Sequence, residues 1–200
     1  TALGYQLSRN YEDNFSVFNE TSVENIFTIP MDKNFYTNQM QYLFRSRHYN
    51  HAKAYGLSGE NGPSATIEAL RTFGYDTGSV DSRFDKCYFA GIMLDLNGDT
   101  IRLDNGVVLE VSGKTYEKVA GARMKKYAID KTATKDGKLM DNDIVLFRYA
   151  DVLLMKSEAK VRNGENGDAE LNQVRSRVSM ADRRATLDNI LAERQLEFAW

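Results

Sequence analysis

The chain has 200 residues, of which 42% are hydrophobic and 27% charged, and its formal net charge is −2. This composition is ordinary for a globular protein with one sizeable core, or for a large fragment of a longer one. The near-neutral charge provides no general attraction for polyphosphate and argues against a nucleic-acid partner. The single cysteine, Cys87, excludes an internal disulfide, and the longest apolar run is interrupted by Arg148 and Asp151, which argues against a membrane span.

The first third of the chain is predicted to be poor in regular structure. A short β-like run at residues 26–29 is closed by Pro30, and residues 31–62 are rich in Tyr, Asn, Gln, His and Arg with little periodicity. We expect long loops there, and loops carry function more often than scaffold does. A helix is then expected after Pro63, with Ser64 as its N-cap and Gly74 at its end.

Residues 87–111 are predicted to form β structure. The Asn-Gly pairs at 97–98 and 105–106 lie between alternating apolar residues, which is a signal for hairpin turns. Residues 95–99, DLNGD, superficially resemble a calcium loop, but the following Gly and the closing Glu are not at the required spacing, so a hairpin turn is favoured. Residues 135–138, KDGK, indicate another turn.

The last sixty residues favour helices. Residues 144–161 are strongly apolar and predict a buried helix, with an acidic entry at Asp141 and Asp143 and an exit at residues 163–164, Asn-Gly. A second helix is predicted near residues 169–178, and a third after Thr186, running to the end of the chain. Short links between helices with one apolar face predict antiparallel helix packing.

Three segments in this region carry a family resemblance. They are RYADVLLMKSEA at 148–159, LNQVRSR at 171–177 and ERQLEFAW at 193–200. In order and spacing they resemble the motifs of the SusD/RagB family. Looser counterparts are NYEDNF at 10–15, NETSVENIF at 19–27, NGPSAT at 61–66 and DSRF at 81–84.

The resemblance implies a fold that is mainly α with small β hairpins, containing TPR-like helix pairs, most of which would precede this chain. The whole chain, 1–200, would be a C-terminal portion of such a protein. Residues 1–140 would form its irregular, ligand-side part, and residues 141–200 its helical scaffold.

The resemblance also implies a function. Members are surface-exposed lipoproteins of the outer membrane of Bacteroidetes-type bacteria, which cap a SusC-like TonB-dependent transporter and deliver oligosaccharides to it. We therefore expect a non-catalytic glycan-binding component without cofactor or metal. It would touch the membrane only through an upstream lipid anchor, so Cys87 would not be the anchor.

Glycan binding needs aromatic faces for sugar rings together with polar groups for hydroxyls. One segment supplies both kinds of side chain, and the resemblance places part of the ligand site in the same stretch, before the NGPSAT segment. The candidate ligand-binding residues are Tyr36, Tyr42, Phe44, Arg45, His48, Tyr49, Asn50, His51 and Tyr55.

Other interpretations of the charged residues were weighed. Glu193 and Glu197 are four residues apart on a predicted helix and could suggest a general acid and base, but ion pairs with Arg175, Arg177 or Arg194 are favoured. A metal site at the only two histidines is disfavoured, because no third ligand is evident. Two alternative functions stay open: binding of a peptide or glycopeptide, or a role mainly in contacting the transporter. A helical-repeat adaptor is the weakest alternative.

Overall fold

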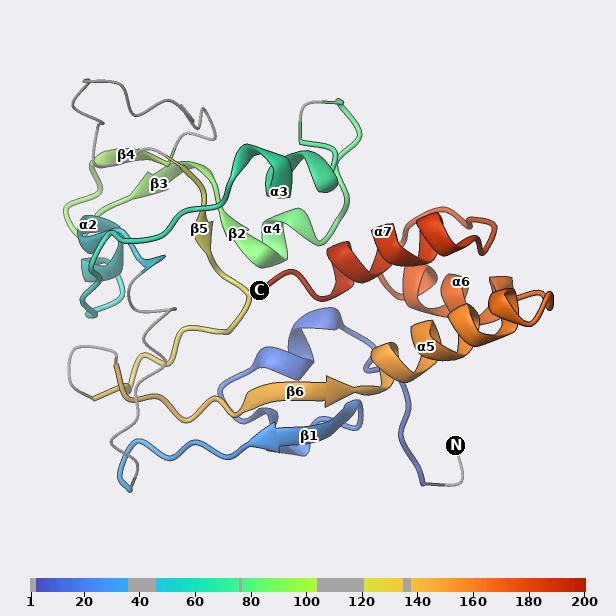
Figure 1. The fold of residues 1–200 in the computed structure, drawn as a ribbon. Coiled ribbons are helices and arrows are strands. Elements are labelled where there is room, and N and C mark those ends of the chain that lie inside the picture. The colour runs from blue at the N-terminus through green and yellow to red at the C-terminus, as the bar shows by residue number, and fades with distance from the viewer. Residues whose placement is uncertain (1–2, 36–45, 76, 104–120, 135–137) are drawn as a thin grey trace.

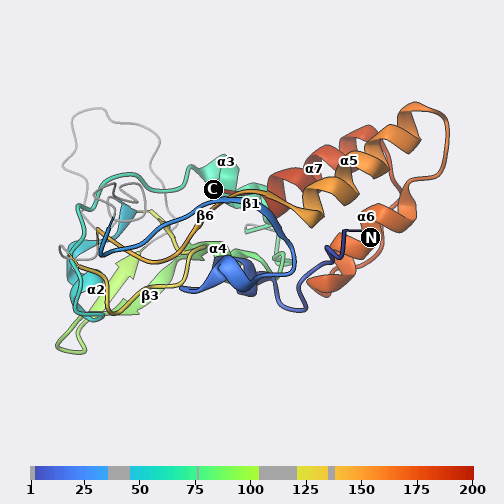
Figure 2. The ribbon, with the colours of Figure 1, turned by 90° about the horizontal axis from the view of Figure 1, so that it is seen from below.

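The computed structural model describes residues 3–35, 46–75, 77–103, 121–134 and 138–200. In this part of the chain, short helices and pairs of antiparallel strands precede three longer C-terminal helices (Figure 1). The long helices lie at one end of the molecule and the β3–β4 hairpin and α2 at the other, as both views show (Figures 1 and 2). The predicted mixture of helices with small β hairpins is confirmed.

The N-terminal segment joins the C-terminal half of the chain through a small sheet. Two 3-10 helices, η1 (Tyr11–Phe15) and η2 (Asn19–Thr21), lead into strand β1 (Asn25–Ile29). Strand β1 pairs with β6 (Ile144–Arg148) in an antiparallel register, with irregularities on either side of Phe27. The strand predicted at residues 26–29 is therefore confirmed, and its partner comes from the far end of the sequence.

The middle of the chain holds three short helices, which are α2 (Tyr49–Lys53), α3 (Ile67–Thr72) and α4 (Phe84–Cys87). Helix α2 lies inside the region that was predicted to be loops. The N-cap of α3 is Thr66, whose hydroxyl accepts from the Ala69 N–H, so the prediction of Ser64 as the cap was wrong by two residues.

The predicted β region is partly confirmed. Strands β3 (Gly91–Leu94) and β4 (Thr100–Leu103) form an antiparallel hairpin, and the Asp95 carboxylate accepts from the backbone at positions 97 and 99 across its turn. The DLNGD segment is thus a hairpin turn. Cys87, in contrast, ends helix α4 and does not begin a strand, while the turn predicted at 105–106 lies outside the described residues.

Two further strands tie the middle region together. Strand β2 (Tyr88–Phe89) pairs with β5 (Arg123–Met124), which brings the residues that follow α4 beside a segment more than thirty positions later. Thr134 and Leu139 form an isolated antiparallel bridge around the predicted KDGK turn, of which residues 135–137 lie outside the described residues.

The prediction of one helix over residues 144–161 was wrong at its start. Residues 144–148 form β6, because their backbone pairs with that of β1. Arg148 still has an extended backbone, with φ −140° and ψ 164°. The helix α5 (Tyr149–Arg162) begins only after it. Asp143 is not a helix entry either, since its carboxylate accepts from the Thr28 hydroxyl and the Met31 N–H.

The other two long helices are α6 (Asp168–Arg177) and α7 (Leu187–Glu197). The Thr186 hydroxyl accepts from the Asn189 N–H, which confirms the predicted cap of α7. The helix ends at Glu197, not at the end of the chain as predicted. Among the described residues, no helix combines the length and apolar character needed to cross a bilayer.

The helices pack around a core of their own. Its buried members are Ala150, Leu153, Leu154, Leu171, Val174, Ala185 and Ile190. Helix α5 is not buried all round as predicted, because Val152 and Met155 are 38% and 48% exposed on the face turned away from α6 and α7. A second core gathers around Tyr11, Phe15, Phe73, Tyr88 and Met124, and it joins the N-terminal segment to the middle region.

A cluster of opposite charges lies between the two cores. This buried charge cluster consists of Glu24, Asp81, Arg83, Arg148, Arg175, Arg177, Glu193 and Glu197. All of these side chains are at most 5% exposed, and carboxylates and guanidiniums are equal in number. The equal numbers matter because an unpaired buried charge costs several kcal/mol.

All charges in the cluster except Asp81, which pairs with nearby Arg83, have ion-pair partners from other segments. Arg83 lies 2.7 Å from Glu193 and 2.8 Å from Glu197, while Arg148 and Arg177 each bond both Glu24 and Glu197. The guanidiniums hold the pKa of Glu197 down at about 2 despite its burial. The predicted structural role of Glu193 and Glu197 is confirmed, although Arg194 pairs with Asp151 instead.

Candidate functional site

A cavity of about 310 Å³ opens beside β2 and the end of α2. We call it the Tyr55 cavity. Its lining residues are Glu12, Tyr55, Lys86, Phe89, Lys125, Lys126, Tyr127, Ala128 and Ile129. The lining thus combines three aromatic rings with charged side chains at its rim, which is the combination that a sugar ring with its hydroxyl groups requires.

The rings reach the cavity from three separate segments. Tyr55 follows α2, Phe89 ends β2, and Tyr127 comes shortly after β5. The pairing of β2 with β5 brings the second and third together. Tyr127 is fixed by its hydroxyl, which accepts from the Val145 N–H at 2.9 Å, and it packs edge-on against Phe15.

His51 supports two of these rings from behind. Its imidazole lies 4.8 Å from the Phe89 ring and 5.3 Å from the Tyr55 ring, measured between centroids, and both contacts are edge-to-face. Edge-to-face packing of this kind fixes ring orientation. Tyr55 and Phe89 are half-buried, so part of each ring keeps contact with solvent.

Charged groups surround the aromatic floor. The Lys86 ammonium pairs with Glu12, and the Lys125 ammonium donates to the Asp85 carbonyl and lies 5.6 Å from the centre of the Phe89 ring. The side chains of Glu12, Lys86 and Lys125 keep solvent contact, so their bonds can be exchanged for bonds to a ligand.

Two of the predicted ligand-binding residues are inaccessible. His48 and His51 are only 2% and 5% exposed. Burial is the main cause that lowers the pKa of each imidazole. The charge of Arg123 lowers the pKa of His48 further, and His48 and Arg47 lower the pKa of His51 further. Both imidazoles are thus kept neutral at pH 7. The His48 imidazole accepts from the Asn50 N–H and caps α2, so its observed role is structural.

The other candidates are distributed unevenly. Tyr55 lines the cavity, whereas Tyr49 and Asn50 are half-buried on α2 and do not line it. Tyr36, Tyr42, Phe44 and Arg45 lie outside the described residues. Sequence reasoning missed Phe89, Tyr127 and the lysines, because nothing in the sequence indicates that β2 and β5 pair across the residues between them.

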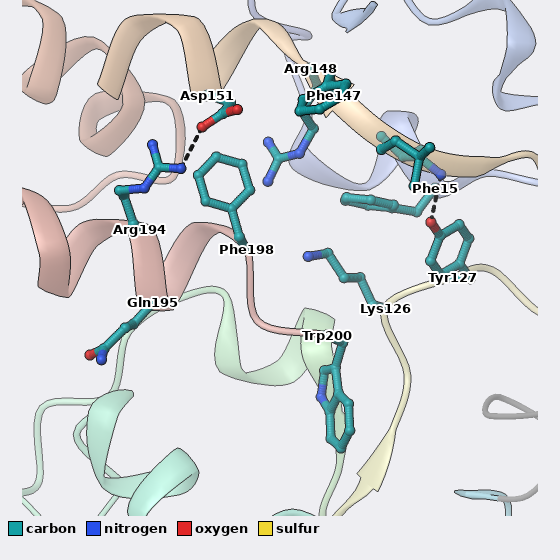
Figure 3. A pocket seen from close by; sticks show the side chains of 12 residues that line it. Phe15, Lys126, Tyr127, Phe147, Arg148, Asp151, Arg194, Gln195, Phe198 and Trp200 are labelled. Carbon is teal, nitrogen blue, oxygen red and sulfur yellow. Dashed lines mark hydrogen bonds and ion pairs between the residues drawn. The ribbon is translucent and has the colours of Figure 1, made fainter. Parts of the chain in front are cut away.

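A larger cavity of about 500 Å³ lies between β6, α5 and α7 (Figure 3). Lys126, Arg148 and Arg194 point toward its interior, where Phe198 lies between the guanidiniums. Arg148 is 4.7 Å and Arg194 5.2 Å from the Phe198 ring, and Arg194 pairs with Asp151 at 2.7 Å. These polar groups already serve each other or the buried charge cluster. We therefore regard the Tyr55 cavity as the better candidate site.

Lys126 stands in the wall between the two cavities. Its ammonium donates to the Ala199 carbonyl at 2.7 Å and lies 4.8 Å from the Phe15 ring. Burial lowers its pKa to about 7, and the charge of Arg148 contributes to the shift. Lys126 thus changes charge near neutral pH.

The acidic and metal-ligating side chains bear on metal and acid–base chemistry. Within the part of the chain that the structure describes, no three His, Cys, Asp or Glu side chains gather as a metal site would need. The paired carboxylates of Glu193 and Glu197 are completely buried and bonded to arginines, and the low pKa of Glu197 makes it a poor proton donor.

Comparison with known proteins gives a family match to part of the chain and a fold for almost all of it. Residues 106–200 match the model of the SusD family. Comparison with curated proteins finds no match.

Solved structures match almost the whole chain. A surface glycan-binding protein A from Bacteroides thetaiotaomicron is 21% identical with a TM-score of 0.71, and the match covers 98% of this chain and 44% of that one. A laminarin-binding SusD-like protein is 19% identical with a TM-score of 0.66 and coverages of 98% and 43%. The structure of surface glycan-binding protein A from Bacteroides thetaiotaomicron in complex with laminarihexaose is 20% identical with a TM-score of 0.60. That match covers 98% of this chain and 44% of the other.

These matches define a SusD-like fold, as the motifs in the sequence predicted. The match to the SusD family model lies on residues 106–200, and almost the whole chain shares the fold of SusD-like structures. The chain spans about two fifths of the length of the solved structures it matches.

Proposed function

We propose that this protein binds an oligosaccharide in the Tyr55 cavity, as a non-catalytic component of the cell surface. The observation that carries the proposal is the convergence of Tyr55, Phe89 and Tyr127 on one cavity with charged groups at its rim. Several solved structures with this fold are named as glycan-binding, and one holds laminarihexaose. These names support the ligand class.

The binding would rely on stacking and on hydrogen bonds that are exchanged at the rim. The open faces of Tyr55 and Phe89 would take the apolar C–H face of a sugar ring, and Glu12, Lys86 and Lys125 would bond its hydroxyl groups. No bond of the sugar would be broken. The bound glycan would then pass to a TonB-dependent transporter, with the protein held by a lipid anchor at the outer membrane.

Calorimetric titration of the full-length protein against plant, host and microbial oligosaccharides tests this proposal. We expect binding of one glycan class without saccharide release, which mass spectrometry of the recovered ligand would check. The Tyr55→Ala and Phe89→Ala variants should each lose at least about fivefold in affinity, since stacking of this kind contributes on the order of 1 kcal/mol or more per ring.

The matched control is Phe18→Ala, which removes an exposed ring outside this cavity and should leave affinity unchanged. Equal loss in all three variants, or none in any, would place the site elsewhere. Release of shorter saccharides would overturn the non-catalytic proposal. Absence of any sugar binding, together with co-purification of the transporter, would favour the alternative of a peptide ligand or of transporter contact.

A further inference from the structure

The charges around the Tyr55 cavity are unbalanced. The lining holds three lysines, which are Lys86, Lys125 and Lys126, and one carboxylate, that of Glu12. Glu12 is already paired with Lys86. Among the described residues, no carboxylate lies within ion-pair distance of the other two ammonium groups, which bond only to backbone carbonyls. This excess occurs in a chain whose net charge is −2.

Further positive charge lies behind the aromatic floor. Arg47 and Arg123 are 6% and 3% exposed, and they act on His51 and His48 respectively, lowering the pKa of each imidazole. Buried charge is screened much less by salt and water than charge at the surface. The lysines in the lining carry the charge that an entering ligand meets, and this charge favours a negative ligand.

Lys125 brings one of these positive charges next to the aromatic rings of the cavity. Its ammonium lies over the Phe89 ring, 5.6 Å from the ring centre, so a group on a sugar bound at this ring would come within its reach. Its one bond is to the Asp85 carbonyl, at the accessible rim. A carboxylate or sulfate on a stacked sugar would be a stronger partner for the ammonium than a neutral carbonyl.

We propose that the Tyr55 cavity selects an anionic glycan, one whose sugar carries a carboxylate or sulfate group, with Lys125 as the residue that recognises the charge. The inference rests on the proposed glycan binding and names its ligand class. Tyr55 and Phe89 provide affinity for the ring, and Lys125 discriminates between acidic and neutral sugars.

The test compares ligands that differ only in charge. The full-length protein would be titrated with oligogalacturonate and with the same oligomer fully methyl-esterified, and then with chondroitin sulfate and laminarihexaose oligosaccharides. We expect the best acidic ligand to bind at least about tenfold more tightly than the neutral ones, and this ratio to shrink in about 0.5 M NaCl. Comparison of chondroitin sulfate with unsulfated chondroitin, which keeps the carboxylates, distinguishes a sulfate from a carboxylate.

Lys125→Gln removes the charge but keeps a polar side chain, and it should abolish most of that preference, because affinity for acidic ligands should fall much more than affinity for neutral ones. Lys131→Gln, on an exposed lysine outside the cavity, is the control. Equal affinity for acidic and neutral sugars, or an unchanged preference in Lys125→Gln, would overturn the inference. Binding of neutral sugars that depends on Tyr55 would then leave the proposed function standing, whereas absence of all sugar binding would refute both.

Discussion

At the scale of single residues, the molecule depends on charges that it has removed from water. Glu197 is completely buried and bonds Arg83, Arg148 and Arg177 at the same time. Such an arrangement is tolerable only while every charge is matched, because the loss of one partner leaves another charge buried and uncompensated.

Glu197→Gln is therefore expected to lower the free energy of unfolding by about 3–5 kcal/mol, as measured by urea denaturation at pH 7. Glu165→Gln removes an exposed carboxylate from the link after α5 and should change stability by less than about 0.5 kcal/mol. A small effect of Glu197→Gln on the free energy of unfolding would mean that the three guanidiniums find other partners.

The lowered pKa of Glu197 predicts that the protein loses stability in acid. Since the folded pKa of Glu197 is about 2 and its ordinary value is 4.5, its contribution is complete above pH 4.5 and is lost as pH falls toward 2. The stability difference between the parent protein and Glu197→Gln should narrow over that interval. A difference that stays constant from pH 5 to pH 3 would contradict the assignment.

Lys126 gives the opposite kind of pH dependence. Its pKa is lowered from 10.5 to about 7, so between these values the unfolded chain holds a proton that the native protein has released. Native stability must then rise with pH across this window. Relative to Lys126→Met, the parent should become more stable by a few kcal/mol between pH 6 and pH 9 in denaturant titrations.

Lys131→Met serves as the control for Lys126, because its exposed ammonium should give a difference that is flat over the same range. Around Lys126 the other charged or titratable groups are Tyr11, Arg83, Cys87, Arg148 and Glu197. They are present in both proteins, so most of their own titration cancels in the comparison. A flat difference for Lys126 as well would show that the lysine stays charged.

At the scale of elements, the helices are joined more closely than their sequences suggest. A Cβ at Gly167, which precedes α6, would lie 2.6 Å from the Ser157 carbonyl oxygen in α5 and 2.8 Å from its hydroxyl. Only glycine permits this approach, and the Ser157 hydroxyl uses it to donate to the Gly167 carbonyl at 2.9 Å.

Gly167→Ala is expected to destabilise the protein by about 1–3 kcal/mol, because backbone atoms must move apart to accept the methyl group. The sign of the stability change shows whether the close contact decides the outcome. The φ of Gly167 is −103°, which alanine adopts easily, so without the contact the change would be stabilising. Glu165→Ala in the same link should have little effect in the same thermal or urea unfolding measurement.

Some features of these elements could be predicted from the sequence, and others could not. Caps and turns with local chemistry, such as Thr186 before α7 and Gly164 after α5, were found because their signals lie within a few residues. The start of α5 was misplaced because apolar residues 144–148 satisfy a helix pattern as well as a strand pattern. Only the distant partner β1 decides between them.

The candidate site shows the same limit. Tyr55 was predicted from the local density of aromatic and polar residues, whereas Phe89 and Lys125 belong to segments of ordinary composition. They reach the cavity only because β2 pairs with β5. His51 was predicted as a ligand group for its chemistry, and its burial behind the rings could be known only from tertiary packing.

At the scale of the whole molecule, one carboxylate links three distant parts. Glu24 accepts from the Ser8 N–H and the Asn14 amide in its own segment, from Arg148 before α5 and from Arg177 at the end of α6. Together with Glu197 it shares two guanidiniums, so the N-terminal segment and the C-terminal helix depend on the same arginines.

A double-mutant cycle should detect this dependence. Glu24→Gln and Glu197→Gln are each expected to destabilise the protein strongly, and the double variant should differ from the sum of the two by at least about 1 kcal/mol. Glu24→Gln combined with Gly167→Ala, which share no partner, should be additive. Additive behaviour of the two glutamate variants would mean that each arginine depends on one carboxylate alone.

The position of Glu24 in the sequence has a consequence for how the chain matures. Its bond to Arg177 joins residues 153 positions apart, and its bond to Arg148 joins residues 124 apart. During synthesis the N-terminal segment must wait, with its carboxylate still hydrated, until the helices that neutralise it have emerged from the ribosome. This part of the native structure can therefore assemble only after the chain has been synthesised through Arg177.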